Sequence, residues 1–278
     1  MEVEVKFMGR LANRLFQYCF GRIIADALQF DLSSQKIPDF DAAVSVKRSE
    51  PMISSKALET EIFEGHIVNL EEIFEKKTPR IIRLQGYFQR YEYYKDHKDQ
   101  IREWLQTSVT DKIASDKYSF GDKDLTISIR SGDIWQHPEK KTVHGGYCAL
   151  PYSFYQEIIE SEEWDQIYIV TEDPSDLMIR KLVEEYSCIV YSNSPVEDFC
   201  ILKSSKNIVL SVSTFAWWAS WLSEASQVFM PIAGVFDRKS RSDINLVVDD
   251  EDRYNFIEVD VEHPWTGSHE TRVKLLNV

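Results

Sequence analysis

The sequence has few cysteines and no long apolar run. Its four cysteines, Cys19, Cys148, Cys188 and Cys200, form no CxxC pair, so neither a zinc site nor a disulfide framework has the usual spacing. We therefore expect reduced, buried thiols. The longest apolar block, residues 215–222, is far shorter than the about eighteen residues that span a membrane. The chain opens without a basic segment followed by an apolar run, so we expect no secretory leader and a cytoplasmic location.

Basic residues are also in the minority. The 32 lysines and arginines are outnumbered by 46 aspartates and glutamates, which gives a formal net charge of -14. Such a surface repels the phosphates of nucleic acid on average, so we predict no nucleic-acid partner. A local basic pocket for a small phosphate ligand is compatible with this balance. The 278 residues suffice for one large domain or two of ordinary size.

The first half of the chain predicts a mixed α/β unit. Residues 2–7 alternate as a short strand, and a glycine turn then leads into an apolar-periodic helix over 15–28. Residues 31–78 predict only short elements and loops, and a helix is expected over 91–105. The polar stretch 107–123 is the predicted boundary region, and it divides the chain into domains 1–118 and 119–278.

The second half alternates strongly between apolar strands and helices. The expected strands are 125–129, 166–170, 188–191, 207–211 and 227–230, and the expected helices are 151–161, 176–186, 195–203 and 215–224. β-Branched strands that alternate with helices predict a parallel sheet covered on both faces. Ligands of such sheets bind at the carboxyl ends of the strands.

Several polar loops follow predicted strands. They are Gly9 to Asn13, Arg130 to Asp133, Thr171 to Pro174 and Ser211 to Thr214. Arg130 suits a phosphate, because its guanidinium offers paired donors, although it could equally cap the sheet and pair with Asp133. Ser213 and Thr214 are predicted helix caps beside free N–H groups that attract anions. Glu172 and Asp173 could accept from the N–H edge of guanine, or could simply cap the next helix.

Four motifs in order resemble one known family. They are Met8-Gly-Arg-Leu-Ala-Asn-Arg-Leu-Phe-Gln-Tyr18, Leu84-Gln-Gly-Tyr-Phe-Gln89, Ile127-Ser-Ile-Arg-Ser-Gly-Asp133 and Ser213-Thr-Phe-Ala-Trp-Trp-Ala-Ser-Trp-Leu222. This series is similar to that of the α-1,2-fucosyltransferases of glycosyltransferase family 11, and Met8-Gly-Arg also resembles the protein O-fucosyltransferases. The resemblance implies a GT-B-type fold of two Rossmann-like lobes with parallel sheets and a cleft between them. It also implies a GDP-fucose donor, a carbohydrate acceptor, inversion at the sugar carbon and no metal.

The resemblance also implies roles for individual residues. Arg130 would hold the donor diphosphate, with Ser213 and Thr214 contacting it from the helix end and Glu172 or Asp173 reading guanine. Gly9, Arg10 and Asn13 would bind the donor from the N-terminal, acceptor-side lobe. Asp133 is the candidate base, or else it orients Arg130. We assign Arg130, Asp133 and Asn13 to catalysis, and His137, His144 and Tyr147 to an acceptor-side loop over 134–150.

The sequence departs from the family pattern at four positions. Ser128 and Ser131 stand where the family has His and a second Arg, and Ala12 and Arg14 stand where Gly and Gln are common. Two alternatives therefore stay open: transfer of another deoxysugar on the same fold, and a non-catalytic module that binds sugar nucleotides or glycans.

Three further clusters have structural interpretations. We predict that Trp217, Trp218 and Trp221, spaced along one helix face, pack in the core. Asp122-Lys-Asp124 precedes a strand, at the end of the sheet that does not bind ligands, and 249–252 is expected to be a solvated acidic turn.

Overall fold

The computed structural model describes residues 1–48, 58–107, 118–135, 146–261, 265 and 267–278. The chain forms two compact units. The N-terminal unit comprises Met1–Ser108 together with Asp243–Asn245, and the C-terminal unit comprises Val109–Ser242 and Leu246–Val278. The first of these units ends at the start of the polar stretch 107–123, whereas the predicted domains meet after residue 118.

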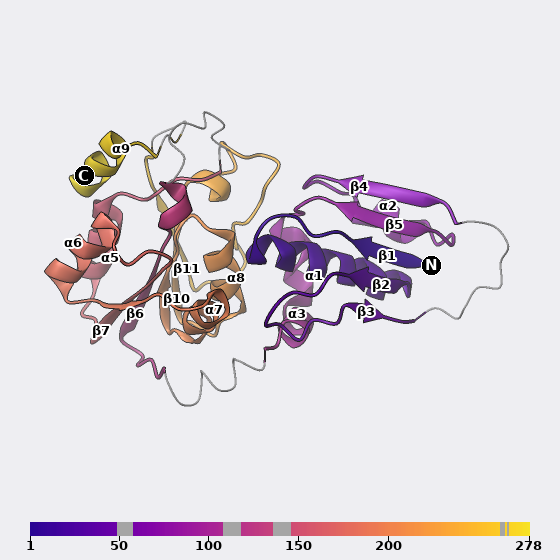
Figure 1. Cartoon of the computed structure of the whole chain (residues 1–278), viewed down its shortest axis with the longest axis horizontal. Helices are drawn as coiled ribbons and strands as arrows, with labels where there is room; N and C mark the ends of the chain where they lie inside the picture. The colour runs from indigo at the N-terminus through magenta and orange to yellow at the C-terminus, as the bar shows by residue number, and fades with distance from the viewer. Residues whose placement is uncertain (49–57, 108–117, 136–145, 262–264, 266) are drawn as a thin grey trace. The chain divides into compact units, whose positions relative to one another are not determined.

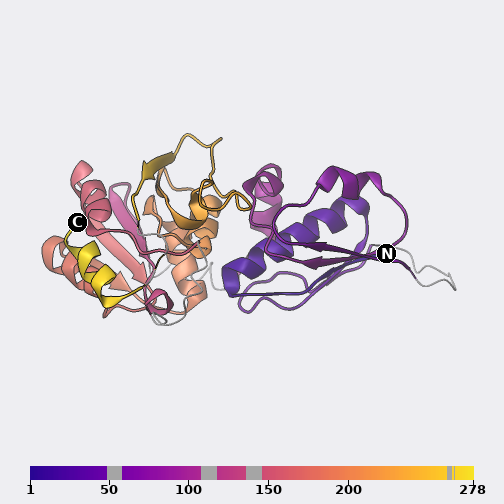
Figure 2. The same cartoon turned by 90° about the horizontal axis from the view of Figure 1, so that it is seen from above.

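The N-terminal unit is built on a five-stranded sheet in the order β3-β2-β1-β5-β4 (Figure 1). The strands are β1 (Glu2–Val5), β2 (Asp31–Ser34), β3 (Ser45–Val46), β4 (Thr60–Glu64) and β5 (Ile81–Gln85). All neighbours pair in parallel except β2 and β3. The long helix α1 (Leu11–Leu28) packs against β1 and β2, and two short helices, α2 (Leu70–Glu75) and α3 (Lys98–Trp104), complete the unit (Figure 2).

The predicted helix over 91–105 is wrong in its first half. Two 3₁₀ turns, Tyr91–Tyr93 and Lys95–His97, precede α3. The tyrosine hydroxyls explain the difference: Tyr94 donates to the carbonyls of Phe88 and Phe16, at 2.7 and 3.2 Å, and Tyr93 donates to the carbonyl of Val68. These buried contacts to distant residues fix the backbone locally and outweigh helix propensity.

The C-terminal unit contains a six-stranded, wholly parallel sheet in the order β11-β10-β9-β6-β7-β8. The strands are β6 (Asp124–Ile129), β7 (Gln166–Thr171), β8 (Ile189–Tyr191), β9 (Asn207–Val209), β10 (Gln227–Ile232) and β11 (Tyr254–Glu258). Figure 1 shows α5 (Tyr152–Ser161) and α6 (Leu177–Tyr186) on one side of this sheet, and α7 (Pro195–Ser204) and α8 (Thr214–Leu222) on the other. The predicted doubly covered parallel sheet is confirmed.

Sequence patterns missed the end of the chain. They gave neither β11 nor the last helix, α9 (His269–Leu276), and they extended the strand at 207 by two residues too many. The prediction for the tryptophans is confirmed, because the side chains of Trp217, Trp218 and Trp221 are fully buried. The rings of Trp217 and Trp221 stack, and the Trp218 ring packs edge-on against both. The four cysteines are free and buried, as expected.

Candidate functional site

The strand order of the C-terminal unit creates a switch point between β6 and β9. From β6 the chain proceeds to β7 and β8 on one side, then crosses back to β9 and β10 on the other. Crevices at the carboxyl ends of such strands are where open parallel sheets bind ligands. Arg130 directly follows β6, and Ser211 follows β9 by two residues. The fold thus brings two of the predicted loops to adjacent strand ends.

Buried hydroxyl groups join these loops. The Ser128 and Ser211 Oγ atoms lie 3.1 Å apart, across β6 and β9. On the other side of β6, Ser131 Oγ lies 2.8 Å from Thr171 Oγ1 and accepts a hydrogen bond from the backbone N–H of Asp173, also at 2.8 Å. Both family departures in this motif are therefore structural here. Ser131 is fully buried, so a side chain as large as arginine does not fit its position in this chain.

Arg130 is positioned by an aromatic ring. Its guanidinium carbon lies 4.1 Å from the centroid of the Tyr147 ring, a cation–π distance. The flat face of the ring restricts the guanidinium to one plane. Tyr147, predicted for the acceptor side, is thereby placed beside the predicted diphosphate ligand. The same guanidinium opposes the effect of burial on Cys148, whose pKa burial raises to about 12.

The third predicted loop ends in a well-formed helix cap. Ser213 has an extended backbone and its side chain accepts a hydrogen bond from the N–H of Phe215, so it is the N-cap of α8. Thr214 is the first residue of this helix. The first turn of α8 directs its remaining backbone N–H groups and the positive end of the helix dipole toward the end of β9.

The two carboxylates after β7 have different surroundings. Asp173 Oδ1 accepts from the N–H and the hydroxyl of Ser175, at 2.9 and 2.6 Å, and these bonds hold the pKa of Asp173 below its usual value. Glu172 is exposed, and its carboxylate lies against Gly132, where an added Cβ would be 3.2 Å from Oε2. Asp173 therefore closes a local turn, whereas Glu172 extends toward the loop that carries Arg130.

In the N-terminal unit, the glycine turn before α1 is held by side chains from that helix. Gly9 has a φ of +73°, a conformation that other residues rarely adopt. The buried amide of Gln17 accepts from the N–H of Met8 at 2.8 Å and donates to its carbonyl at 3.2 Å. Arg14 donates to the Gly9 carbonyl, and Arg10 is the N-cap residue of α1. The turn is thus fixed on both sides of Gly9.

Asn13 has a partner that sequence patterns did not assign. Gln89 Nε2 donates to Asn13 Oδ1 at 2.8 Å, joining the first helix to the segment after β5. Gln89 ends one of the four motifs, but its contact with a residue 76 positions away is invisible in the sequence. Gln17 was likewise inside a motif and given no role.

Several predicted residues are placed only in part. His137 and His144 lie outside the described residues, and Asp133 is described by its backbone alone, in a 3₁₀ turn over Gly132–Ile134. Asp124 begins β6 at its amino end, as predicted, and its carboxylate accepts from the N–H of Gly121 at 2.7 Å. Among the described residues, no group of three His, Cys, Asp or Glu side chains could hold a metal ion, and none of their helices is long and apolar enough to cross a membrane. The cytoplasmic location stays a prediction.

Solved structures of sugar transferases share this fold. POFUT1 in complex with GDP-fucose matches 81% of this chain and 94% of its own, with a TM-score of 0.51 and 11% identity. An Arabidopsis thaliana FUT1 mutant in complex with GDP matches 82% of this chain and 70% of its own, with a TM-score of 0.53 and 13% identity. The two parallel sheets and the likeness to these fucosyltransferases define the chain as a GT-B-type α/β protein.

The sequence comparisons narrow this class to a family. The model of glycosyl transferase family 11 matches residues 65–247, more than half of the chain, so the chain belongs to glycosyltransferase family 11. It is also 28% identical over 153 residues to the O-antigen biosynthesis glycosyltransferase WbnK of Escherichia coli. That match covers 50% of each protein, so the chain spans about half the length of this relative.

Proposed function

We propose that the protein transfers L-fucose from GDP-fucose to a hydroxyl of a carbohydrate acceptor, forming an α-1,2 linkage with inversion at the sugar carbon. The observation that carries this proposal is the placement of Arg130 and the amino end of α8 after β6 and β9, two adjacent strands at the switch point of the sheet. A guanidinium and a helix terminus together suit a diphosphate. The related structures that bind GDP or GDP-fucose support this donor.

The proposed chemistry is a single displacement. The acceptor oxygen attacks C1 of fucose and forms the new glycosidic bond while the bond from C1 to the diphosphate oxygen breaks. The acceptor proton passes to a base, for which Asp133 is our candidate, and the charge that develops on GDP is stabilised by Arg130 and the N–H groups of α8. The positive groups are in place before the reaction, so they need little reorganisation when the charge develops.

Glu172 is our candidate for reading guanine. Its exposed carboxylate extends toward the loop that carries Arg130 and has the acceptor oxygens that the N1–H and N2–H₂ groups of guanine require. Replacement of Glu172 by Gln would lower affinity for GDP more than affinity for ADP, which presents no such pair of donors. Equal losses for the two nucleotides would assign guanine recognition to other residues.

Removal of Arg130 tests the proposed function directly. Arg130→Ala should lower the rate of transfer from GDP-fucose by about a hundredfold or more, because the leaving diphosphate loses a preorganised donor. Arg130→Lys keeps the positive charge but not the paired donors, so its rate of transfer should lie between those of the wild type and Arg130→Ala. Each variant is first shown to unfold at the wild-type temperature. Turnover of a folded Arg130→Ala variant within about threefold of wild type would contradict the assignment.

The two alternatives predict different ligand responses. An enzyme for another deoxysugar would release GDP from a different nucleotide sugar faster than from GDP-fucose. A non-catalytic module would bind GDP and gain thermal stability with it, about 2.7 kcal/mol at a hundred times the dissociation constant, yet release no GDP from any nucleotide sugar. Slow hydrolysis of GDP-fucose without acceptor supports the proposed enzyme.

A further inference from the structure

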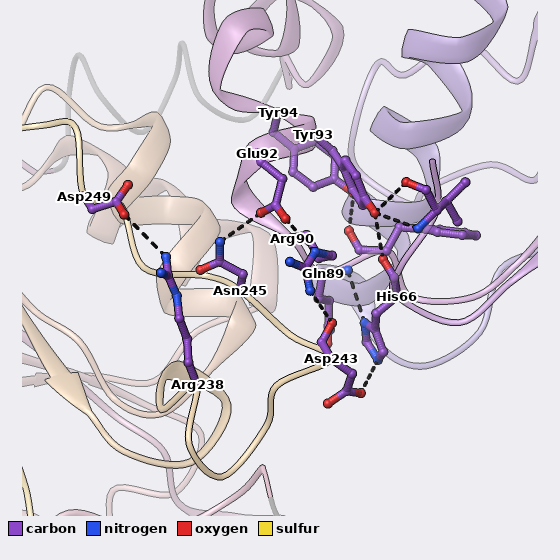
Figure 3. Close-up of polar contacts among 12 residues, drawn as sticks. His66, Gln89, Arg90, Glu92, Tyr93, Tyr94, Arg238, Asp243, Asn245 and Asp249 are labelled. Carbon is purple, nitrogen blue, oxygen red and sulfur yellow. Dashed lines mark hydrogen bonds and ion pairs between the residues drawn. The ribbon is translucent and has the colours of Figure 1, made fainter. Parts of the chain in front are cut away.

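The segment around Gln89 is fixed more firmly than an ordinary loop. The backbone N–H of Gln89 donates to Nδ1 of His66 at 3.2 Å, and the Gln89 carbonyl accepts from the N–H of Asn245 at 3.0 Å. The Gln89 side chain is 6% exposed. Both main-chain groups of Gln89 are therefore hydrogen-bonded, and Figure 3 shows the contact with His66.

His66, which accepts the backbone hydrogen bond from Gln89, has contacts of its own that orient its ring. Because Nδ1 of His66 accepts a hydrogen bond, the proton of the neutral ring is on Nε2, and Nε2 faces Oδ2 of Asp243 at 3.7 Å. The His66 ring also stacks on Tyr87, with the ring centroids 5.9 Å apart. His66 is thus oriented by groups on either side of it.

The short segment Asp243–Asn245 binds the N-terminal unit in the manner of an added strand. The Asn245 carbonyl accepts from the N–H of Tyr91, and Asn245 forms a parallel bridge with Arg90. Arg90 donates to the carbonyl of Asp243 at 3.1 Å, and the Asn245 side chain donates to Glu92 at 2.9 Å. Asp243 and Asn245, from late in the sequence, therefore hold Gln89 and the residues that follow it (Figure 3).

The Gln89 side chain contacts Asn13, one of the predicted donor-binding residues. The Gln89 amide donates to Oδ1 of Asn13, which leaves the Asn13 Nδ2 group directed at the glycine turn. An added Cβ at Gly9 would lie only 2.4 Å from that nitrogen, so the Asn13 amide packs directly on Gly9. A carboxamide can rotate by 180° and exchange its oxygen and nitrogen, and the donor from Gln89 selects one of the two orientations.

We propose that Gln89 is a positioning residue for the reaction, and that it acts by fixing the orientation of the Asn13 amide. His66 and the Asp243–Asn245 segment hold Gln89 in place. This inference rests on the proposed function and on the role in donor binding and transfer that the family resemblance implies for Asn13. It adds a residue that would touch neither the donor nor the acceptor.

A double-mutant cycle tests the proposal. Gln89→Ala should lower kcat/KM for GDP-fucose about tenfold, an effect of the size expected for one hydrogen bond. The same substitution made in an Asn13→Ala background should lower it less than twofold, because the group that Gln89 orients is gone. Equal losses in both backgrounds, or no loss in the wild-type background, would overturn the proposal.

An isosteric substitution separates orientation from packing. Gln89→Glu keeps the size of the side chain but replaces its N–H donor with an acceptor, which favours the flipped Asn13 amide. We expect this variant to lose activity as Gln89→Ala does, and circular dichroism checks that it is folded. The matched control, Gln106→Glu, makes the same charge change at an exposed position and should keep full activity. A fully active Gln89→Glu variant would contradict the proposal.

The cycle also distinguishes this inference from the proposed function. Wild-type activity in the Asn13→Ala variant would remove Asn13 from the reaction and thereby overturn both its assignment and the inference. A large loss in Asn13→Ala with none in Gln89→Ala would overturn the inference alone. The side-chain ¹⁵N resonance of Asn13 provides a readout that does not depend on turnover: Gln89→Glu should shift it, and Gln106→Glu should not.

Discussion

At the scale of single residues, the Tyr147 ring helps to orient the guanidinium of Arg130. The guanidinium carbon of Arg130 lies 4.1 Å from the centroid of the Tyr147 ring. A guanidinium that stacks on an aromatic face can still form hydrogen bonds in its own plane. We therefore propose that Tyr147 orients Arg130 toward the diphosphate.

Substitution of Tyr147 tests this arrangement. Tyr147→Ala should weaken GDP binding by about threefold to tenfold, because Arg130 loses a contact worth about 0.5 to 1 kcal/mol or somewhat more. Tyr147→Phe retains the ring face and should bind GDP like wild type. Titration calorimetry with GDP measures both. If the Ala variant binds as tightly as wild type, the ring does not position Arg130.

The role of a residue could be predicted only where the sequence pattern also gives its position, as it does for polar residues that follow apolar strands. Arg130 and Ser213 follow apolar strands, so a parallel sheet places them at its binding edge. The pairing of Gln89 with Asn13 depends on how β5 and α1 come together in three dimensions. The different surroundings of Glu172 and Asp173 depend on where Ser175 turns the chain. Such contacts leave no periodicity in the sequence.

At the scale of secondary-structure elements, the amino end of α8 has a structural and a proposed binding role. Ser213→Ala removes the cap and should lower the free energy of unfolding by about 1 kcal/mol. It should also weaken GDP binding if the diphosphate lies there. Ser213→Asp separates the two roles, since aspartate caps the helix but repels a diphosphate. We expect near-wild-type stability and weak GDP binding; tight GDP binding by this variant would place the diphosphate elsewhere.

The ends of β4 and β5 meet through two glycines. A Cβ added at Gly86 would lie 2.1 Å from the backbone oxygen of Gly65, which side-chain adjustment cannot relieve. Gly86→Ala should therefore lower the free energy of unfolding by about 3 kcal/mol. The control is Gly121→Ala, whose added Cβ would meet nothing closer than 3.5 Å. Chemical denaturation compares the two, and similar small losses would show that these strand ends separate easily.

Elements were predictable where burial sets a clear period. The strands and helices from β6 to β10 follow their apolar patterns to within one or two residues. The stretch before α3 was not predictable, because tyrosine hydroxyls bonded to distant carbonyls replace helix by 3₁₀ turns. The last strand, β11, lies at the edge of its sheet and buries only Tyr254, so no apolar period marks it in the sequence.

At the scale of the whole molecule, the two compact units are not simple consecutive halves. Asp243–Asn245 belongs to the N-terminal unit through main-chain hydrogen bonds to Gln89 and Tyr91. Backbone pairing of this kind does not depend on side-chain identity, so no residue pattern reveals it. A chain cut before residue 243 would therefore remove part of the N-terminal unit as well.

The charge of the whole molecule bears on the last prediction, that transfer needs no divalent metal. A net charge of -14 means that a diphosphate binds only where positive groups are concentrated. We propose that Arg130 and the dipole of α8 supply this stabilisation, a role that a cation held by an Asp-x-Asp motif has in other sugar transferases. Asp124, in one such motif, is committed to a turn through Gly121 at the amino end of β6, the opposite end from Arg130.

Sugar transfer should therefore survive exhaustive chelation with about the wild-type rate. The measurement compares untreated enzyme, chelated enzyme, and chelated enzyme supplied with magnesium or manganese. Chelation must leave the unfolding temperature unchanged, so that any loss of activity reports on the reaction rather than on folding. If chelation abolished transfer and the metal restored it, the diphosphate charge would be met by a cation, and Arg130→Ala should then be far milder than about a hundredfold. Chelation and Arg130→Ala therefore test the same point from two sides. A large effect of Arg130→Ala assigns stabilisation of the leaving diphosphate to the protein, whereas a large effect of chelation would assign it to a metal.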